Sequence, residues 1–297
     1  MTKQGGFRDF IQLIKPSLSI MVVFSSVISY LLVPDVLYEW WRLVLLFAGG
    51  LLVTGSANTI NMVVEKDSDA RMKRTAKRPI ASGKITPEQG WGFAILTGAM
   101  GIFILGYFFN WWAAGIAAFS LFLYAFVYTP LKKVNSIAVL VGAVPGALPC
   151  LIGWVAGFVH GQAIDWLGGI VLFGIQFLWQ FPHFWAIAWI AHQDYSAVGF
   201  KLLPSESGPT KFTALQTVIY SLLLLPMTLV PFYTGMCSLA STGGIIGFVL
   251  VILANIFMIF RSINLYRNMD RTAARKVMFG SYIYLPVVLL ALLLAKI

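Results

Sequence analysis

An asparagine and two carboxylates recur at four-residue spacing directly after a long apolar segment. Asn61, Glu65 and Asp69 hold these positions, and a further carboxylate, Asp67, follows Glu65 by two residues. On a continuing helix, residues four positions apart drift by only about 40° per step, so the three regularly spaced residues share one face. Carboxylate and amide oxygens suit Mg²⁺, which proteins typically hold through one or two carboxylates and the phosphates of a substrate. The spacing therefore predicts a magnesium site.

A run of cations follows these acids. Arginine binds phosphate oxygens through two parallel hydrogen bonds, and lysine neutralises phosphate as a point charge. Acids followed by cations therefore predict a site for a metal-bound diphosphate, with Arg74 and Arg78 among its contacts. The alternative is that the acids and cations cap the helix end and pair with one another at the membrane surface. The cations of this run are Arg71, Lys73, Arg74, Lys77 and Arg78.

The elements that carry these residues are predicted to be membrane helices. The chain has 297 residues, of which 59% are hydrophobic and only 11% are charged, whereas soluble domains carry about 25% charged residues. This composition predicts an all-α integral membrane protein formed by a single polytopic domain over 1–297, with no sizeable soluble part. Apolar runs of about 20 residues indicate transmembrane helices. The nine expected spans are 17–33, 42–64, 90–109, 112–129, 136–157, 166–190, 213–233, 242–261 and 277–295.

The positive charges predict the orientation of these spans. All Lys and Arg residues except Arg42 and Lys296 precede the first span or follow an even-numbered one. Because cytoplasmic loops carry the excess of positive charge, we expect the N-terminus and the acidic loop inside and the C-terminus outside the cell membrane. The net charge of +10 is explained in the same way, so no nucleic-acid partner is expected. The two cysteines lack the spacing of a zinc ribbon or of covalent heme attachment.

The first acidic segment resembles the first signature of the UbiA-type intramembrane prenyltransferases. From Asn61 to Pro79 it reads NxxxExxxD followed by RMKRTxxRP, and more narrowly it is similar to the protoheme IX farnesyltransferase (heme O synthase) branch. The resemblance implies about nine helices around a central cavity that opens to the cytoplasmic side. The expected ligands of the divalent cation, Mg²⁺, are Asn61, Glu65, Asp69 and, from a later loop, Asp194.

A second segment carries the same resemblance. Tyr128 begins YTPLKKVN, and a helix rich in Gly, Ala and Pro follows from Gly142 to Trp154. Small residues let membrane helices approach closely, whatever the function. Cys150 departs from the family, which commonly has a second proline there. Tyr128 and Lys132 are expected at the diphosphate, although Lys132 could instead be an interfacial anchor whose charged end reaches water.

A third segment points to the heme branch. Trp179 to Trp185 reads WQFPHFW, and Asp194-Tyr195 follows in the next loop. His183 is the expected heme contact, since histidine often ligates heme iron; it could instead bind a propionate or be a packed polar residue. The wider family has a DxxxD motif in this loop, whereas Asp194 stands alone, which leaves a second metal ion open.

The resemblance implies a membrane-bound prenyltransferase that moves a farnesyl group from farnesyl diphosphate to a vinyl group of protoheme IX. The products would be heme O and diphosphate, with heme as substrate and a heme A synthase or terminal oxidase assembly downstream. One alternative is a UbiA-type enzyme with another acceptor. Another is a transporter, which would keep ionisable groups near the membrane midplane, and a third is a scaffold subunit without catalysis.

Overall fold

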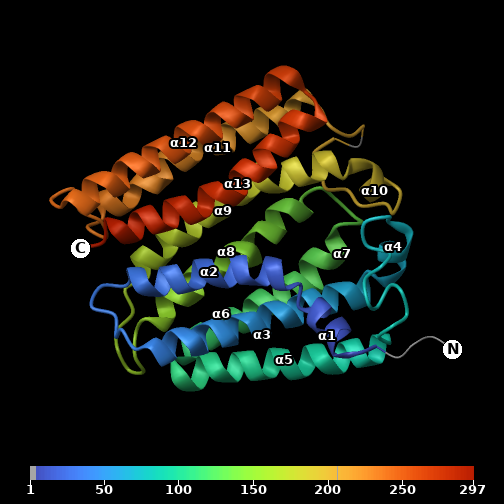
Figure 1. Cartoon of the computed structure of the whole chain (residues 1–297), viewed down its shortest axis with the longest axis horizontal. Coiled ribbons are helices and arrows are strands. Elements are labelled where there is room, and N and C mark those ends of the chain that lie inside the picture. Colours follow the sequence, from blue (N-terminus) through green and yellow to red (C-terminus); the bar gives the residue numbers. More distant parts are fainter. Residues whose placement is uncertain (1–4, 206) are drawn as a thin grey trace.

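The computed structural model describes residues 5–205 and 207–297, and every regular element in that part of the chain is helical. Long helices lie side by side along one direction (Figure 1). The elements are α1 (Phe7–Leu13), α2 (Pro16–Leu32), α3 (Trp40–Val64), α4 (Lys66–Arg71), α5 (Pro87–Phe108), α6 (Trp111–Phe122), the π-helix η1 (Leu123–Tyr128), α7 (Thr129–Leu131), α8 (Ala138–Ala156), α9 (Trp166–Ile190), α10 (His192–Ser196), α11 (Lys211–Tyr233), α12 (Thr242–Asn268) and α13 (Arg271–Leu294).

The expected set of membrane spans is confirmed. Within the described ranges, eight helices or continuous helix groups are long and apolar enough to cross a membrane, and α1 with α2 makes a ninth if the bent pair counts as one span. The two helices meet at 48° at Lys15, whose backbone is left-handed with φ of 46°. Pro16 then opens α2, where its fixed φ suits the first helical turn.

The last two helices extend beyond the spans expected from the apolar runs. The polar segment 262–276 lies between the expected spans 242–261 and 277–295 and is mostly helical, because α12 runs to Asn268 and α13 begins at Arg271. Only Met269, in the left-handed region with φ of 54°, and Asp270 lie between them. The Asp270 carboxylate accepts a hydrogen bond of 2.6 Å from the backbone N–H of Ala273, and this N-cap starts α13 at once. Charged helix ends therefore extend past the apolar segments.

The helices form two groups with α8 and α9 between them. In Figure 1, α11, α12 and α13 lie on one side and α2, α3 and α5 on the other, and α8 packs against both α2 and α9. Close approach needs small residues: a Cβ at Gly153 of α8 would collide with the backbone carbonyl of Ser26 in α2. The glycines of α8 therefore set the spacing of the helices at the centre.

The C-terminus is tied to the end of α2. The ammonium of Lys296 donates hydrogen bonds to the backbone carbonyls of Leu31, at 2.8 Å, and Val33, at 2.7 Å. These carbonyls lie at a helix end and lack partners within the helix. Burial lowers the pKa of Lys296, and the negative charge of Asp35 opposes that shift. Because α13 also packs on α2, the first and last long helices are neighbours.

Replacing Gly153 with Ala tests the contact between α8 and α2. The added methyl group has no space, so we expect a loss of about 1–3 kcal/mol in the free energy of unfolding, measured by thermal unfolding in detergent. Gly115→Ala is the matched control, because a Cβ there meets nothing within 4 Å. Equal stability of both variants would contradict the close approach.

Candidate active site

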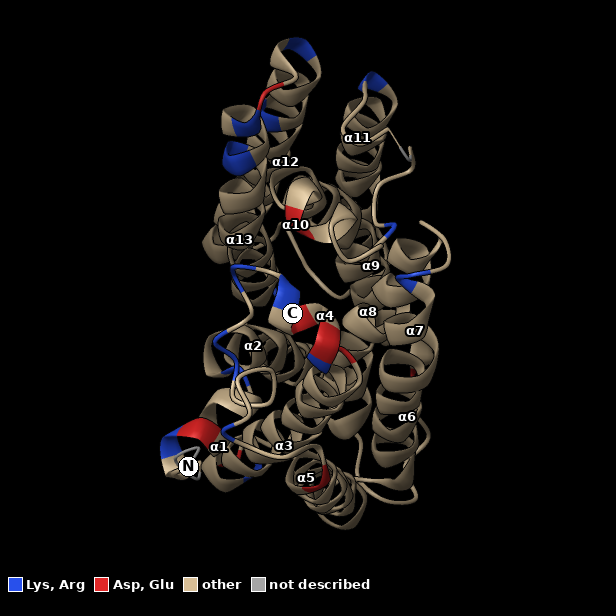
Figure 2. Cartoon of the chain, turned by 90° about the vertical axis from the view of Figure 1, so that its right-hand side faces the viewer, with Lys and Arg blue, Asp and Glu red and all other residues tan. Residues whose placement is uncertain are grey.

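A cleft of about 140 Å³ opens at the end of the molecule that carries α4, α7 and α10. Figure 2 views this end, where acidic segments of α4 and α10 appear near the centre among basic loop segments. The cleft brings together all the predicted site residues except Asp194 and His183. Its lining consists of Asn61, Glu65, Asp69, Met72, Arg74, Arg78, Tyr124, Tyr128, Lys132, Tyr195, Phe200 and Leu202.

The helix that carries the acids continues almost unbroken through them. The backbone N–H of Glu65 bonds the carbonyl of Asn61 at 2.9 Å, and that of Asp69 bonds the carbonyl of Glu65 at 2.7 Å. The expected common face therefore persists from α3 into α4, although the backbone turns at Glu65. Glu65 is 5% exposed and Asp69 is fully buried, whereas Asp67 is exposed and does not line the cleft.

Each buried carboxylate is paired with a cation. Lys132 Nζ lies 2.7 Å from Glu65 Oε1, and Arg78 Nη1 lies 2.8 and 2.7 Å from the two carboxylate oxygens of Asp69. Lys15 Nζ reaches Asn61 Oδ1 at 3.5 Å. The alternative that acids and cations pair with one another thus describes this ligand-free arrangement, and these contacts keep the charges neutralised where water is scarce.

Lys132 is aimed into the cleft by an irregular stretch of helix. The π-helix η1 carries Tyr124 and Tyr128, whose ring centroids are 5.2 Å apart, and Lys132 Nζ lies 4.5 Å from the centroid of the Tyr128 ring. Such π-turns occur frequently at functional sites. A Cβ at Gly142 would press on the Tyr128 ring, so the glycine gives that ring its place. Sequence reasoning missed Tyr124, which precedes Tyr128 by four residues.

The loop after α9 covers the cleft from the other side. Tyr195 of α10 accepts a hydrogen bond of 3.4 Å from Arg74 Nη2, and the Arg74 guanidinium carbon lies 5.9 Å from its ring centroid. The backbone N–H of Lys201 bonds the carbonyl of Lys132 at 2.7 Å. Asp194 does not line the cleft, and among the described residues no three His, Cys, Asp or Glu side chains gather as a metal-binding group. The expected role of Asp194 stays a prediction.

His183 lies outside the polar cleft, deep in α9. Its Nδ1 is 2.8 Å from Ser281 Oγ in α13, and its ring stacks on Trp179 at 4.7 Å between centroids. The Tyr282 ring meets it edge-on at 5.0 Å between centroids. Ser281 and two aromatic rings therefore surround the imidazole.

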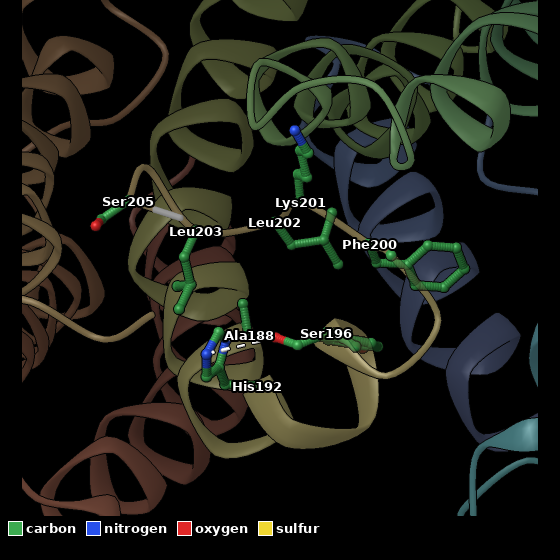
Figure 3. Close-up of a pocket in the computed structure, with 10 residues that line it drawn as sticks. Ala188, His192, Ser196, Phe200, Lys201, Leu202, Leu203 and Ser205 are labelled. Atoms are coloured by element: carbon green, nitrogen blue, oxygen red, sulfur yellow. Dashed lines mark hydrogen bonds between the residues drawn. The ribbon is translucent and has the colours of Figure 1, made fainter. Parts of the chain in front are cut away.

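A second cavity, of about 250 Å³, adjoins the cleft and shares Tyr195, Phe200 and Leu202 with it. Figure 3 shows His192 and Ser196 on one side of this cavity and the segment from Phe200 to Leu203 on the other. His192 is held near Ser196 Oγ, with Nδ1 at 3.3 Å. His192 lines this second cavity and not the cleft with the acids of the first loop.

Comparison with known proteins identifies the family. Residues 22–285 match the model of the UbiA prenyltransferase family. The chain belongs to the UbiA prenyltransferase family. It is 43% identical over 295 residues to the protoheme IX farnesyltransferase of Cytophaga hutchinsonii, covering 98% of each chain. As a member of this family of enzymes it is a prenyltransferase and a multi-pass membrane protein, so the transporter and scaffold alternatives are set aside.

Solved structures agree on the fold. A structure described as digeranylgeranylglyceryl phosphate synthase superposes with a TM-score of 0.78 at 19% identity, covering 97% of each chain. A UbiA homolog from Archaeoglobus fulgidus bound to GPP and Mg²⁺ gives a TM-score of 0.64 at 13% identity, covering 96% of this chain and 99% of that one. The UbiA fold expected from the sequence motifs is thereby confirmed.

The buried pair of Glu65 and Lys132 can be tested by stability. Lys132→Met leaves a buried carboxylate without its partner, so we expect a loss of about 3 kcal/mol, measured by thermal unfolding in detergent. Adding Glu65→Gln should recover most of that loss. Lys84→Met is the control. Lys84 is 51% exposed and forms a surface ion pair with Asp9 at 3.3 Å, and such exposed pairs contribute about 0–1 kcal/mol. A similar small effect at both lysines would contradict the buried pairing.

Proposed function

We propose that the protein transfers a farnesyl group from farnesyl diphosphate to a vinyl group of protoheme IX, giving heme O and diphosphate. Support from the molecule comes chiefly from one observation: two buried carboxylates and two long cationic side chains converge in a cleft at the end of membrane helices. The near full-length similarity to a protoheme IX farnesyltransferase favours heme over another acceptor.

The donor set of the cleft fits a magnesium ion. Glu65 and Asp69 supply hard carboxylate oxygens and Asn61 an amide oxygen, all on one helix face, as Mg²⁺ prefers. Asp194, beside the cleft residue Tyr195, is proposed as an additional ligand. When bound, the metal supplies Lewis-acid neutralisation of the diphosphate leaving group.

The cations of the cleft take up the remaining negative charge. Lys132 and Arg78 already lie beside the carboxylates. Once the carboxylates bind Mg²⁺ instead, both cationic side chains can bind a diphosphate placed between them. Arg74 makes no ion pair among the described residues; its guanidinium donates a hydrogen bond to Tyr195 and has further N–H groups to offer to phosphate oxygens. These contacts strengthen as charge develops on the leaving group.

The aromatic rings of the cleft suit the organic half of the reaction. The allylic C–O bond breaks and its electron pair leaves with the diphosphate, so a carbocation forms close to the rings of Tyr124, Tyr128, Tyr195 and Phe200. Aromatic faces attract cations. The vinyl group of the acceptor then forms the new C–C bond, and water adds to the resulting carbocation and releases a proton to solvent to give the alcohol. The Lys and Arg side chains of the cleft hold the released diphosphate, which keeps it from recombining with the carbocation on the acceptor.

The acceptor is proposed to lie toward His183. This histidine does not line the ionic cleft, so an iron contact there would keep the iron apart from the carboxylates and the diphosphate. With the N-terminus inside, the cleft faces the cytoplasm and the C-terminus lies outside the cell membrane. The product would pass to a heme A synthase or to terminal oxidase assembly.

The activity can be measured with the purified protein in nanodiscs. Incubation with farnesyl diphosphate, Mg²⁺ and heme is expected to yield a heme heavier by one farnesyl group and one hydroxyl group, detected by mass spectrometry. Chelation of the metal should abolish the product, because the leaving group then stays unneutralised. Transfer to a hydroxybenzoate or a glycerol phosphate, with heme left unchanged, would favour the other acceptors.

The role of the first acidic face is tested by Asp69→Ala. We expect transfer to fall by at least about 100-fold with normal membrane insertion, judged from expression and gel filtration. Asp67→Ala is the matched control, since Asp67 is a neighbouring but exposed carboxylate. Asp194→Ala should raise the magnesium concentration needed for half-maximal rate. Unchanged transfer in Asp69→Ala would refute the site assignment.

A further inference from the structure

Ser281 contacts His183 and determines both the position of its ring and which ring nitrogen carries the proton. Ser281 is fully buried in α13, and its Oγ lies 2.8 Å from His183 Nδ1 and 2.6 Å from the backbone carbonyl oxygen of Met278. Both distances are those of good hydrogen bonds. One hydroxyl group therefore serves two partners of different chemistry.

Counting hydrogens decides the direction of each bond. A serine hydroxyl has one hydrogen, and the carbonyl of Met278 can only accept, so that hydrogen goes to Met278. The Oγ lone pairs must then accept from His183 Nδ1–H. A neutral imidazole carries one N–H, so the lone pair of His183 is on Nε2. The partner of one ring nitrogen sets the state of the other.

The same serine also orients the ring that stacks on the histidine. Trp179 Nε1 donates a hydrogen bond of 2.8 Å to the backbone carbonyl of Ser281, and the Trp179 and His183 rings are nearly parallel, 15° apart. The Tyr282 ring closes a third side at an interplanar angle of 72°. Tilting the imidazole would disturb each of these contacts, so the direction of Nε2 is fixed.

His183 Nε2 itself is free. It makes no hydrogen bond with any residue in the described ranges, and the protein does not enclose it completely. Histidines that bind metal generally donate their other N–H to a fixed acceptor, which sets the tautomer and ring orientation. We propose that Ser281 is a positioning residue that holds His183 in the Nδ1–H form and thereby presents Nε2 to the iron of the tetrapyrrole substrate. The identity of that substrate rests on the proposed function.

The tautomer can be measured without any ligand. The chain has three histidines, so ¹⁵N-histidine labelling gives few signals, and His183→Gln assigns one of them by its loss. At a pH where this histidine is neutral, we expect a protonated Nδ1 and a bare Nε2 in the wild type and in Ser281→Thr. Ser281→Ala should yield a mixture of tautomers. A proton on Nε2 in the wild type would overturn the inference.

The iron contact is tested by titrating heme into the protein in nanodiscs and recording absorption spectra. Ser281→Ala should weaken heme binding by about 10- to 100-fold and shift the spectrum of the imidazole-bound heme, and Ser281→Thr should restore both. Ser262→Ala is the matched control, because Ser262 is equally buried and its hydroxyl pairs with Ser221 at 2.8 Å; it should leave the spectrum unchanged.

Two outcomes separate this inference from the proposed function. If the wild type farnesylates heme but His183→Ala leaves the heme spectrum unchanged, the function stands and the iron contact is overturned. If His183→Ala removes the imidazole-bound spectrum while Ser281→Ala keeps wild-type affinity and spectrum, the positioning role of Ser281 is overturned. Absence of farnesylated heme in the wild type defeats the proposed function, whatever the histidine tautomer is.

Discussion

Two carboxylates withheld from water govern the cleft. Removing an ion from water costs several kcal/mol even after the protein relaxes, and Glu65 and Asp69 are almost entirely buried. Lys132 and Arg78 offset this cost at distances of 2.7–2.8 Å. The folded chain is thus stable without ligand, while its most polar groups remain concentrated in one place. A ligand with a positive and a negative group can bind the carboxylates through the first and the Lys and Arg side chains through the second, so no buried charge is left unpaired.

This exchange depends on elements that lie far apart in the sequence. The acids come from the α3–α4 junction, Lys132 follows the π-helix η1, and Tyr195 reaches over from α10. Gly142 of α8 leaves room for the Tyr128 ring, over which the ammonium of Lys132 lies. A change in the spacing of the central helices would therefore alter the ionic cleft, even though the glycines carry no charge.

Local patterns in the sequence predicted much of this arrangement. Apolar runs located the spans, and four-residue spacing placed Asn61, Glu65 and Asp69 on one face, because both signals depend on neighbours along a single helix. The partner of each buried carboxylate could not be predicted in the same way. Which cation meets which acid depends on how η1 lies against α3, and the hydrogen bond from Arg74 to Tyr195 joins residues 121 positions apart in the sequence. The helical state of the segment 262–276 could not be predicted from its composition, because polar residues at a membrane surface are as compatible with a protruding helix as with a loop.

The contact of Lys296 with the end of α2 has a mechanical consequence. The helices α2 and α13 form the seam where the beginning of the chain meets its end, and the ammonium fastens this seam at the margin opposite the ionic cleft. Any separation of α2 from α13 at this margin must first break both hydrogen bonds, so the ammonium opposes opening of the bundle at the end remote from the buried acids.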